Sequence, residues 1–146
     1  MRFLILISLL WINNTFASDF NLQSVSFKNN ALIPSIYSCK GEDRSPAFSW
    51  SNAPPLTKSF VFIVEDPDAP LGTWYHWVIF NIPSNITSIT ENTMPSNSVN
   101  GVNSWGKNHY NGPCPPPGQM HHYIFTLYAL DTMLDLTKDA KAVDVK

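Results

Sequence analysis

The stretch that decides the fold reads Phe60-Val61-Phe62-Ile63-Val64-Glu65-Asp66-Pro67-Asp68-Ala69-Pro70. Its first half is an unbroken apolar run, rich in β-branched and aromatic residues, which is typical of a strand buried on both faces. Two prolines then hold two carboxylates in a rigid turn, because proline fixes φ and withholds a backbone donor. Trp74-Tyr75-His76-Trp77 begins a return strand that extends to Asn81. The sequence therefore predicts two core strands joined by an acidic corner.

The composition favours a mostly β protein with many loops. Aromatic residues make up 13% of the chain and charged residues 14%, and there are 12 prolines; this mixture is unusual for a helical bundle. Strands are predicted over residues 19–27 and 47–50, and a long strand over residues 121–130. An irregular excursion is predicted over residues 84–103 and a helix start near Thr137. The formal net charge is −2 and the basic residues are scattered, so no nucleic-acid partner is expected.

The return strand should place its side chains alternately on two faces, since successive Cβ atoms of a strand point in opposite directions. One face would carry Trp74, His76, Val78 and Phe80, and the other Tyr75, Trp77 and Ile79. Both sets are largely apolar, which indicates an interior strand.

The N-terminal residues predict export. Arg2 precedes an apolar run from Phe3 to Ile12, and small residues follow at Thr15 and Ala17, which is the pattern of a secretory signal peptide spanning residues 1–17. The apolar run is too short to span a bilayer, which takes about 20 residues; a retained anchor is the alternative. Residues 18–146 are then expected to form a single domain without a transmembrane segment, located in the periplasm or secreted.

Cys39 and Cys114 are the two cysteines of the chain. An exported protein with an even cysteine count favours a disulfide between them. Two free thiols are the alternative, because the sequence does not show that the sulfur atoms meet.

Several residues could carry chemistry. Asp66 and Asp68 admit a general acid and base pair, or two carboxylates that cap the turn by accepting backbone N–H bonds. His76 and His121 each lie at the mouth of a core strand. A zinc site assembled from Asp66, Asp68, His76 and His121 is conceivable, but no HExxH or CxxC spacing supports it. A Cys114 nucleophile with His121 as base is a third hypothesis, weaker than the disulfide. We expect no metal, no cofactor and no catalytic residue.

Four motifs together carry a family resemblance: residues 66–70, Trp74-Tyr75-His76-Trp77, the glycine–proline loop at 110–118, and His121-His122-Tyr123. With residues 37–46, they resemble the phosphatidylethanolamine-binding protein family, and in particular its bacterial branch of Raf kinase inhibitor-like proteins. The similarity covers roughly residues 22–134.

The resemblance implies a β-sandwich of two sheets with short peripheral helices. It also implies a small, non-enzymatic pocket for phosphate, phosphoethanolamine or a phospholipid headgroup, in a protein that could act as an inhibitor-like regulator of a kinase or protease. A hydrolase that uses the Asp and His residues for acid/base chemistry is the alternative. Backbone N–H groups around a glycine and donating histidines suit a phosphate. The residues expected to bind the ligand are Asp66, Pro70, Trp74, His76, Gly112, Pro113, His121 and Tyr123.

The resemblance further implies a C-terminal helix and a final strand region that helps to wall the pocket. The sequence given ends at Lys146, a turn or two into that helix. An incomplete helix, a more open pocket and lower stability are therefore expected.

Overall fold

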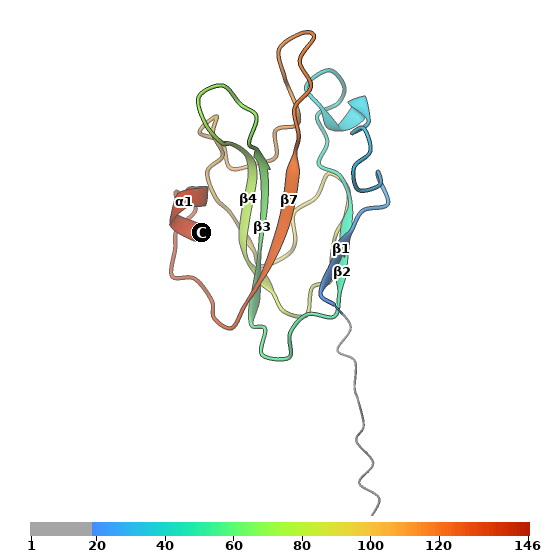
Figure 1. Cartoon of the computed structure of the whole chain (residues 1–146). Helices are drawn as coiled ribbons and strands as arrows, with labels where there is room; N and C mark the ends of the chain where they lie inside the picture. Colours follow the sequence, from blue (N-terminus) through green and yellow to red (C-terminus); the bar gives the residue numbers. More distant parts are fainter. Residues whose placement is uncertain (1–18) are drawn as a thin grey trace, which may run out of the picture.

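Two antiparallel sheets form a sandwich over residues 19–146, the part of the chain that this computed structural model describes (Figure 1). The elements in chain order are β1 (Asn21–Gln23), a 3-10 turn (Ser35–Tyr37), β2 (Phe48–Ser51), β3 (Ser59–Asp66), β4 (Trp74–Pro83), β5 (Ser88–Ile89), β6 (Val99–Asn100), β7 (Ile124–Leu130) and α1 (Ala142–Val145). The expected class, mostly strand with very little helix, is confirmed.

The smaller sheet has the order β1-β2-β5 and the larger sheet the order β6-β4-β3-β7. Strand β3 is interior and pairs with β4 and β7, both antiparallel. It coincides with the apolar run that the sequence singled out, and β4 begins at the predicted residue, Trp74. The acidic corner therefore joins two paired strands, at one end of the larger sheet.

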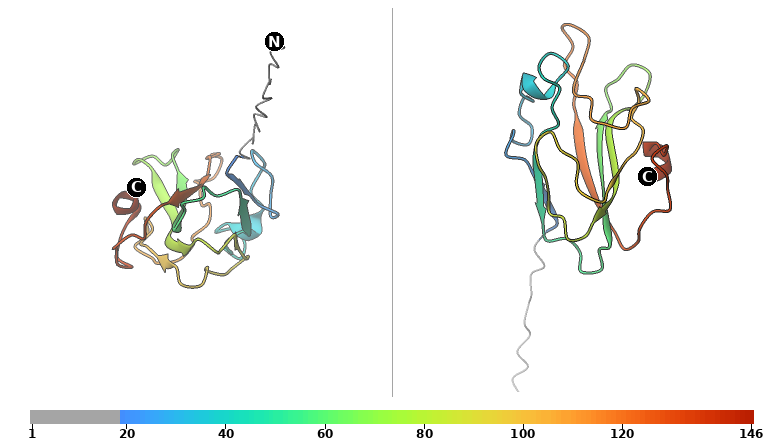
Figure 2. Two further views of the ribbon diagram at one scale, coloured as in Figure 1. Left: turned by 90° about the horizontal axis from the view of Figure 1, so that it is seen from below. Right: turned by 180° about the vertical axis from the view of Figure 1, so that it is seen from behind.

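The core lies on both faces of β3. Between the sheets, Phe60, Phe62 and Val64 pack with the aromatic residues of β2 and β4. On the outer face, Val61 and Ile63 belong to a second cluster that the C-terminal segment covers; Figure 2 shows that segment and α1 on the side of the larger sheet away from β1 and β2. A strand buried on both faces must be apolar at every position, as this sequence is.

A β-bulge interrupts the predicted alternation of β4. Val64 pairs with Trp77 and Glu65 with Tyr75, so His76 is the extra residue opposite β3. Trp77 consequently belongs to the cluster between the sheets, while Tyr75 packs on the outer one. The prediction that Tyr75 and Trp77 share a face is wrong, because a bulge changes the phase of a strand and re-aims its side chains.

Other predicted boundaries also need correction. The strand predicted over residues 19–27 shortens to β1, and β7 begins at Ile124, so His121 to Tyr123 precede the strand. The excursion at residues 84–103 is irregular apart from the two-residue strands β5 and β6.

The helix predicted to start near Thr137 begins only at Ala142. The segment before it is held on the outer face of the larger sheet. The Asn81 side chain accepts the Leu134 N–H and donates to the Leu134 carbonyl, both at 2.8 Å. These tertiary contacts outweigh the local helix signal.

The predicted signal peptide, residues 1–17, lies outside the described residues. Within residues 19–146, none of the helices has the length and apolar character needed to cross a membrane.

Candidate functional site

Asp66 ends β3 and holds His121. Its Oδ2 accepts a hydrogen bond from His121 Nδ1 at 2.7 Å, and both side chains are 7% exposed. Its Oδ1 accepts the Asp68 N–H at 2.9 Å. Asp66 therefore caps the turn by accepting a backbone N–H, which is the second of the two roles that the sequence suggested for it. It also fixes the tautomer and the orientation of His121.

Asp68 forms a second, exposed pair with His122. One carboxylate oxygen accepts both the backbone N–H and Nδ1 of His122, each at 2.7 Å. The backbone N–H bond, followed by the imidazole bond, lowers the pKa of the Asp68 carboxyl. His121 thus binds Asp66 and His122 binds Asp68. These two pairs attach the acidic corner to the segment just before β7.

His76 is buried at the bulge, with 2% of its surface exposed. Its Nδ1–H donates to the Asn111 carbonyl at 2.7 Å, which leaves Nε2 as an acceptor. Burial lowers the pKa of His76, so the ring is neutral. Nε2 is buried and has no hydrogen-bond partner among residues 19–146.

Tyr123 lies against His76, with ring centroids 5.2 Å apart in an edge-to-face arrangement. Its hydroxyl is also buried without a partner in the described part of the chain. Burial, with a smaller contribution from the Asp66 charge, raises the pKa of Tyr123 to about 12, and the nearby Cys114 backbone offsets part of this rise without forming a regular hydrogen bond to the hydroxyl. Buried polar atoms are nearly always hydrogen-bonded in native proteins. Two unpartnered atoms on touching rings therefore indicate a place for a polar ligand, which we call the histidine site: Asp66, His76, His121 and Tyr123.

Asn103, which sequence reasoning missed, organises the loop behind His76. Its Oδ1 accepts the N–H groups of Trp105 and Lys107, both at 3.0 Å. Its Nδ2 donates to the His109 carbonyl and to Asn111 Oδ1, both at 2.8 Å. These bonds hold the residue whose carbonyl orients His76. The available signal was an Asn in a glycine- and asparagine-rich loop, where such side chains commonly bond to nearby backbone.

Trp105 extends the aromatic surroundings of the site and was also not predicted. Its ring lies 5.0 Å from His76 and 5.4 Å from Trp74, centroid to centroid, and the residue is 40% exposed. It covers one side of His76, while Trp74 stands opposite Asp66 in the β3–β4 pairing.

Gly112 does not present its N–H to a ligand, contrary to the expectation. The N–H donates to Asp43 Oδ1 at 2.7 Å. A Cβ at this position would lie 2.1 Å from the Tyr37 carbonyl oxygen, so the glycine permits a close backbone approach. Its role is to let the loop pass the segment that carries Asp43.

The predicted disulfide is present: Cys39 and Cys114 are bonded, with Cα atoms 5.4 Å apart. The Cys39 N–H also donates to the Pro113 carbonyl at 3.1 Å. The bond secures the glycine–proline loop to the segment after the 3-10 turn. It also overturns the hypothesis of a Cys114 nucleophile, because neither cysteine is free.

The structure thus brings together Asp66, His76, His121 and Tyr123, with Trp74 at the edge. Pro113 lies next to the buried Gly112 and lines a groove with His121 and Tyr123. Pro70 is exposed in the turn and makes none of these contacts. Within residues 19–146 there is no group of three or more His, Cys, Asp or Glu residues able to hold a metal ion. The suggested zinc set is divided, since Asp68 faces His122 rather than His76.

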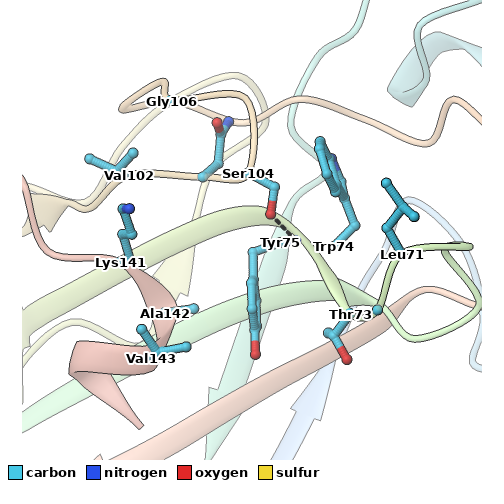
Figure 3. Close-up of a pocket in the computed structure, with 12 residues that line it drawn as sticks. Leu71, Thr73, Trp74, Tyr75, Val102, Ser104, Gly106, Lys141, Ala142 and Val143 are labelled. Atoms are coloured by element: carbon cyan, nitrogen blue, oxygen red, sulfur yellow. Dashed lines mark hydrogen bonds between the residues drawn. The ribbon is translucent and has the colours of Figure 1, made fainter.

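Two depressions lie in this part of the molecule. A groove of about 1220 Å³ runs past Pro113, His121 and Tyr123 toward the N-terminal segment. A smaller pocket of about 460 Å³ lies beside Trp74, between Leu71 and Lys141 (Figure 3). It is bounded by the Ser104 hydroxyl, which accepts the Tyr75 N–H at 2.8 Å. The smaller pocket does not include His76 or His121, so only the larger groove adjoins the histidine site.

Solved structures with this sandwich define the class of protein. A phosphatidylethanolamine-binding protein homologue of Chlamydia trachomatis has a TM-score of 0.81 and 36% identity, over 86% of this chain and 84% of that one. Escherichia coli YbcL, described as a member of the mammalian family, has a TM-score of 0.83 and 31% identity, over 88% and 87%.

The sequence comparisons agree. The family profile described as phosphatidylethanolamine-binding protein matches residues 23–146, and the chain belongs to this family. A UPF0098 protein of Methanothermobacter thermautotrophicus is 48% identical over 130 residues, which cover 86% of this chain and 85% of the relative. A UPF0098 protein of Aquifex aeolicus is 43% identical over 129 residues, covering 84% and 75%.

Proposed function

We propose that this protein binds a phosphate-type anion in the histidine site, either free or as the headgroup of a phospholipid, and that it does so without catalysis. The observation that carries the proposal is the pair of buried, unpartnered polar atoms, His76 Nε2 and the Tyr123 hydroxyl. Leaving such groups unpaired costs about 1–3 kcal/mol each, which a ligand with matching donors and acceptors would recover.

The chemistry of the site suits a phosphate. Tyr123 keeps its proton at neutral pH because its pKa is about 12, so it can donate to a phosphate oxygen. Neutral His76 can accept a hydrogen bond at Nε2 from a phosphate O–H or from an ammonium group. Asp66, which is bonded to His121, lies near enough to Tyr123 for its charge to help raise the Tyr123 pKa, and His121 and Tyr123 line the same groove. Phosphoethanolamine carries both kinds of group.

Export is part of the proposal. The Cys39–Cys114 disulfide supports an oxidising compartment, the periplasm or the cell exterior, because such bonds rarely persist in the cytosol. The inhibitor-like role toward a kinase or protease that the resemblance implies stays a prediction.

The hydrolase alternative rests on the same Asp66–His121 pair, since a carboxylate that orients an imidazole is also found beside general bases. Incubation with a panel of esters, phosphoesters and peptides decides between them. We expect no turnover of any of these substrates. Turnover by the wild type that is lost in His121→Ala would show that the protein is a hydrolase and would contradict the proposal of binding without catalysis.

Calorimetric titration with phosphate and with phosphoethanolamine tests the proposal. A ligand with so few atoms should bind in the micromolar-to-millimolar range. Tyr123→Phe removes one hydroxyl and keeps the ring, and His76→Ala removes the acceptor; both should weaken binding strongly. Tyr128→Phe is the matched control, because Tyr128 is 40% exposed on β7. Equal affinity in the wild type, Tyr123→Phe and His76→Ala would contradict the assignment.

A further inference from the structure

A single peptide group, the one that joins Asn111 to Gly112, lies between His76 and Asp43. Its carbonyl oxygen accepts the hydrogen bond from His76 Nδ1 at 2.7 Å, and its N–H donates to Asp43 Oδ1, also at 2.7 Å. Because the C=O and N–H of a trans peptide group point in opposite directions, the imidazole and the carboxylate are bonded to opposite sides of one amide plane. Both distances lie at the short end of the range for N–H···O bonds.

The Asp43 carboxylate should polarise this peptide group. A negative charge next to the N–H pushes electron density in the amide toward the carbonyl oxygen, which then becomes a stronger hydrogen-bond acceptor for His76 Nδ1. Hydrogen bonds that share a group reinforce one another in this way, by about 10–30% per bond, and bonds to an ionised partner are the stronger ones. Gly112 is buried and Asp43 is partly buried, so water screens the interaction only weakly.

The loop around this peptide group is held in place by other contacts. The Cys39–Cys114 disulfide and the bond from the Cys39 N–H to the Pro113 carbonyl fix its C-terminal side. The Tyr110 hydroxyl fixes its N-terminal side by donating to the Tyr37 carbonyl at 2.7 Å. Loss of the carboxylate charge alone should therefore change the polarisation of the peptide group without displacing it.

Asp43 adopts a backbone conformation that few residues take. Its φ is 56°, in the left-handed region that glycine, asparagine and aspartate tolerate best. Residues held in this region are concentrated at functional sites. The conformation also permits informative substitutions, because asparagine keeps an acceptor oxygen without the charge and glycine removes the side chain, and both fit the same backbone.

Two carboxylates favour the protonated form of His76, and they reach it by different routes. Burial lowers the pKa of His76, and the charges of Asp66 and then of Asp43 oppose this effect. Asp66 lies at the end of β3 and is bonded to His121, while Tyr123, which touches the ring, keeps its proton at neutral pH. Asp43 is bonded to the peptide group behind the ring. Its effect on His76 can therefore be measured separately from that of Asp66.

We propose that Asp43 is a positioning residue of the histidine site and acts on His76 through the peptide group between Asn111 and Gly112. The carboxylate strengthens the bond that holds the proton on Nδ1, and it thereby makes Nε2 a better acceptor for the O–H group of the anion. Carboxylates that bond directly to a metal-binding imidazole have the same effect on the nitrogen that faces the metal; here one amide is interposed. The consequence for ligand binding rests on the proposed function, whereas the consequence for the imidazole ring does not.

Nitrogen and proton NMR of the free protein tests the consequence for the ring. In Asp43→Asn, the Nδ1–H proton of His76 should resonate less far downfield than in the wild type, because its bond to the Asn111 carbonyl is weaker. The Gly112 amide proton should move in the same direction, and the pKa of His76 should be lower because a nearby negative charge is lost. The tautomer should stay the same, which shows that the ring has not been displaced. Asp43→Gly should give larger changes of the same sign.

Calorimetric titration with phosphate tests the consequence for binding. Asp43→Asn should weaken binding about tenfold, the lower end of what loss of an orienting carboxylate costs at metal sites, and Asp43→Gly should weaken it further. Glu42→Gln is the matched control, because it removes the same charge from the neighbouring residue. The Glu42 carboxylate is exposed and pairs with Arg44 rather than with the loop, so the His76 resonances and the phosphate affinity of this variant should equal those of the wild type.

Two results would overturn the inference. One is an unchanged His76 Nδ1–H resonance and pKa in Asp43→Asn; the other is an equal change in Glu42→Gln, which would show that net charge and not the peptide group transmits the effect. Phosphate affinity in Asp43→Asn equal to that of a wild type that binds would overturn the role of Asp43 in ligand binding. If the free protein shows the expected shifts but the wild type binds no phosphate, the positioning of His76 by Asp43 holds and the proposed function fails.

Discussion

His76 combines burial, a fixed tautomer and a free acceptor, and these properties predict a pH dependence of stability. Burial lowers its pKa from about 6.5, so on acidification the unfolded chain takes up this proton before the folded protein does. The contribution of neutral His76 to stability is complete above about pH 6.5 and is lost as the pH falls from there toward the pKa of the folded state.

Urea denaturation at about pH 7.5 and about pH 5 measures this effect. As the pH is lowered, the free energy of unfolding should decrease more in the wild type than in His76→Gln, because the glutamine amide does not titrate. Identical slopes would show that the His76 pKa does not differ between the folded and unfolded states, and would contradict the lowered pKa.

The two aspartate–histidine pairs should contribute unequally to the free energy of unfolding, because one pair is buried and the other is exposed. Asp66→Ala leaves His121 without its partner in a dry environment and should cost about 3 kcal/mol of unfolding free energy. Asp68→Ala should have a much smaller effect, since solvent screens an exposed pair. Equilibrium denaturation of both variants makes the comparison, and equal losses would contradict the difference in burial on which it rests.

For the individual residues of the site, the sequence could predict which side chains lie close together but not which hydrogen bonds they form. The motif pointed to Asp66, His76, His121 and Tyr123, and the structure places them together. It could not show that the Gly112 N–H is taken by Asp43, because those residues are 69 positions apart in the chain. Asn103 escaped notice for a different reason: its partners are close in sequence, but its bonds to them form only in the folded loop.

At the scale of elements, β3 could be predicted because its sequence is an unbroken apolar run. The bulge in β4 could not be predicted. Alternation assumes an unbroken register, and the extra residue at His76 appears only when β4 is aligned with β3. The late start of α1 has a similar cause, since Asn81 fixes the Leu134 backbone from another strand.

The disulfide is the element-scale feature with the largest predicted effect. It joins residues 75 positions apart, and closing a loop of that length stabilises the fold by about 4 kcal/mol in the chain-entropy treatment. The double variant Cys39→Ala, Cys114→Ala should lose roughly that amount in urea denaturation. Thiol titration of the denatured, unreduced protein should find no free thiol, and two free thiols after expression in an oxidising compartment would refute the bond.

For the whole molecule, the composition predicted a mostly β protein with many loops, and the family resemblance implied the sandwich of two sheets; the order of the strands in each sheet appears only in the structure. The expectation of lower stability from an incomplete C-terminal helix stays a prediction.

Ligand binding should stabilise the whole fold, since a phosphate that binds only the folded state shifts the unfolding equilibrium. At a phosphate concentration about a hundredfold above the dissociation constant, the gain should be about 2.7 kcal/mol. Thermal melting with phosphate, compared with an equal ionic strength of chloride, measures it. Tyr123→Phe should show a much smaller shift, and an equal shift in both proteins would place the anion elsewhere.

The most direct test of the account is nitrogen NMR of the histidine rings during a phosphate titration. Free His76 should show a protonated Nδ1 and an unprotonated Nε2, as its bond to the Asn111 carbonyl requires. Phosphate should move the Nε2 resonance of His76 toward that of a protonated or strongly hydrogen-bonded nitrogen, with saturation at the calorimetric affinity. A titration in which the exposed His122 responds while His76 stays unchanged would contradict the central claim that the buried pair of His76 and Tyr123 receives the anion.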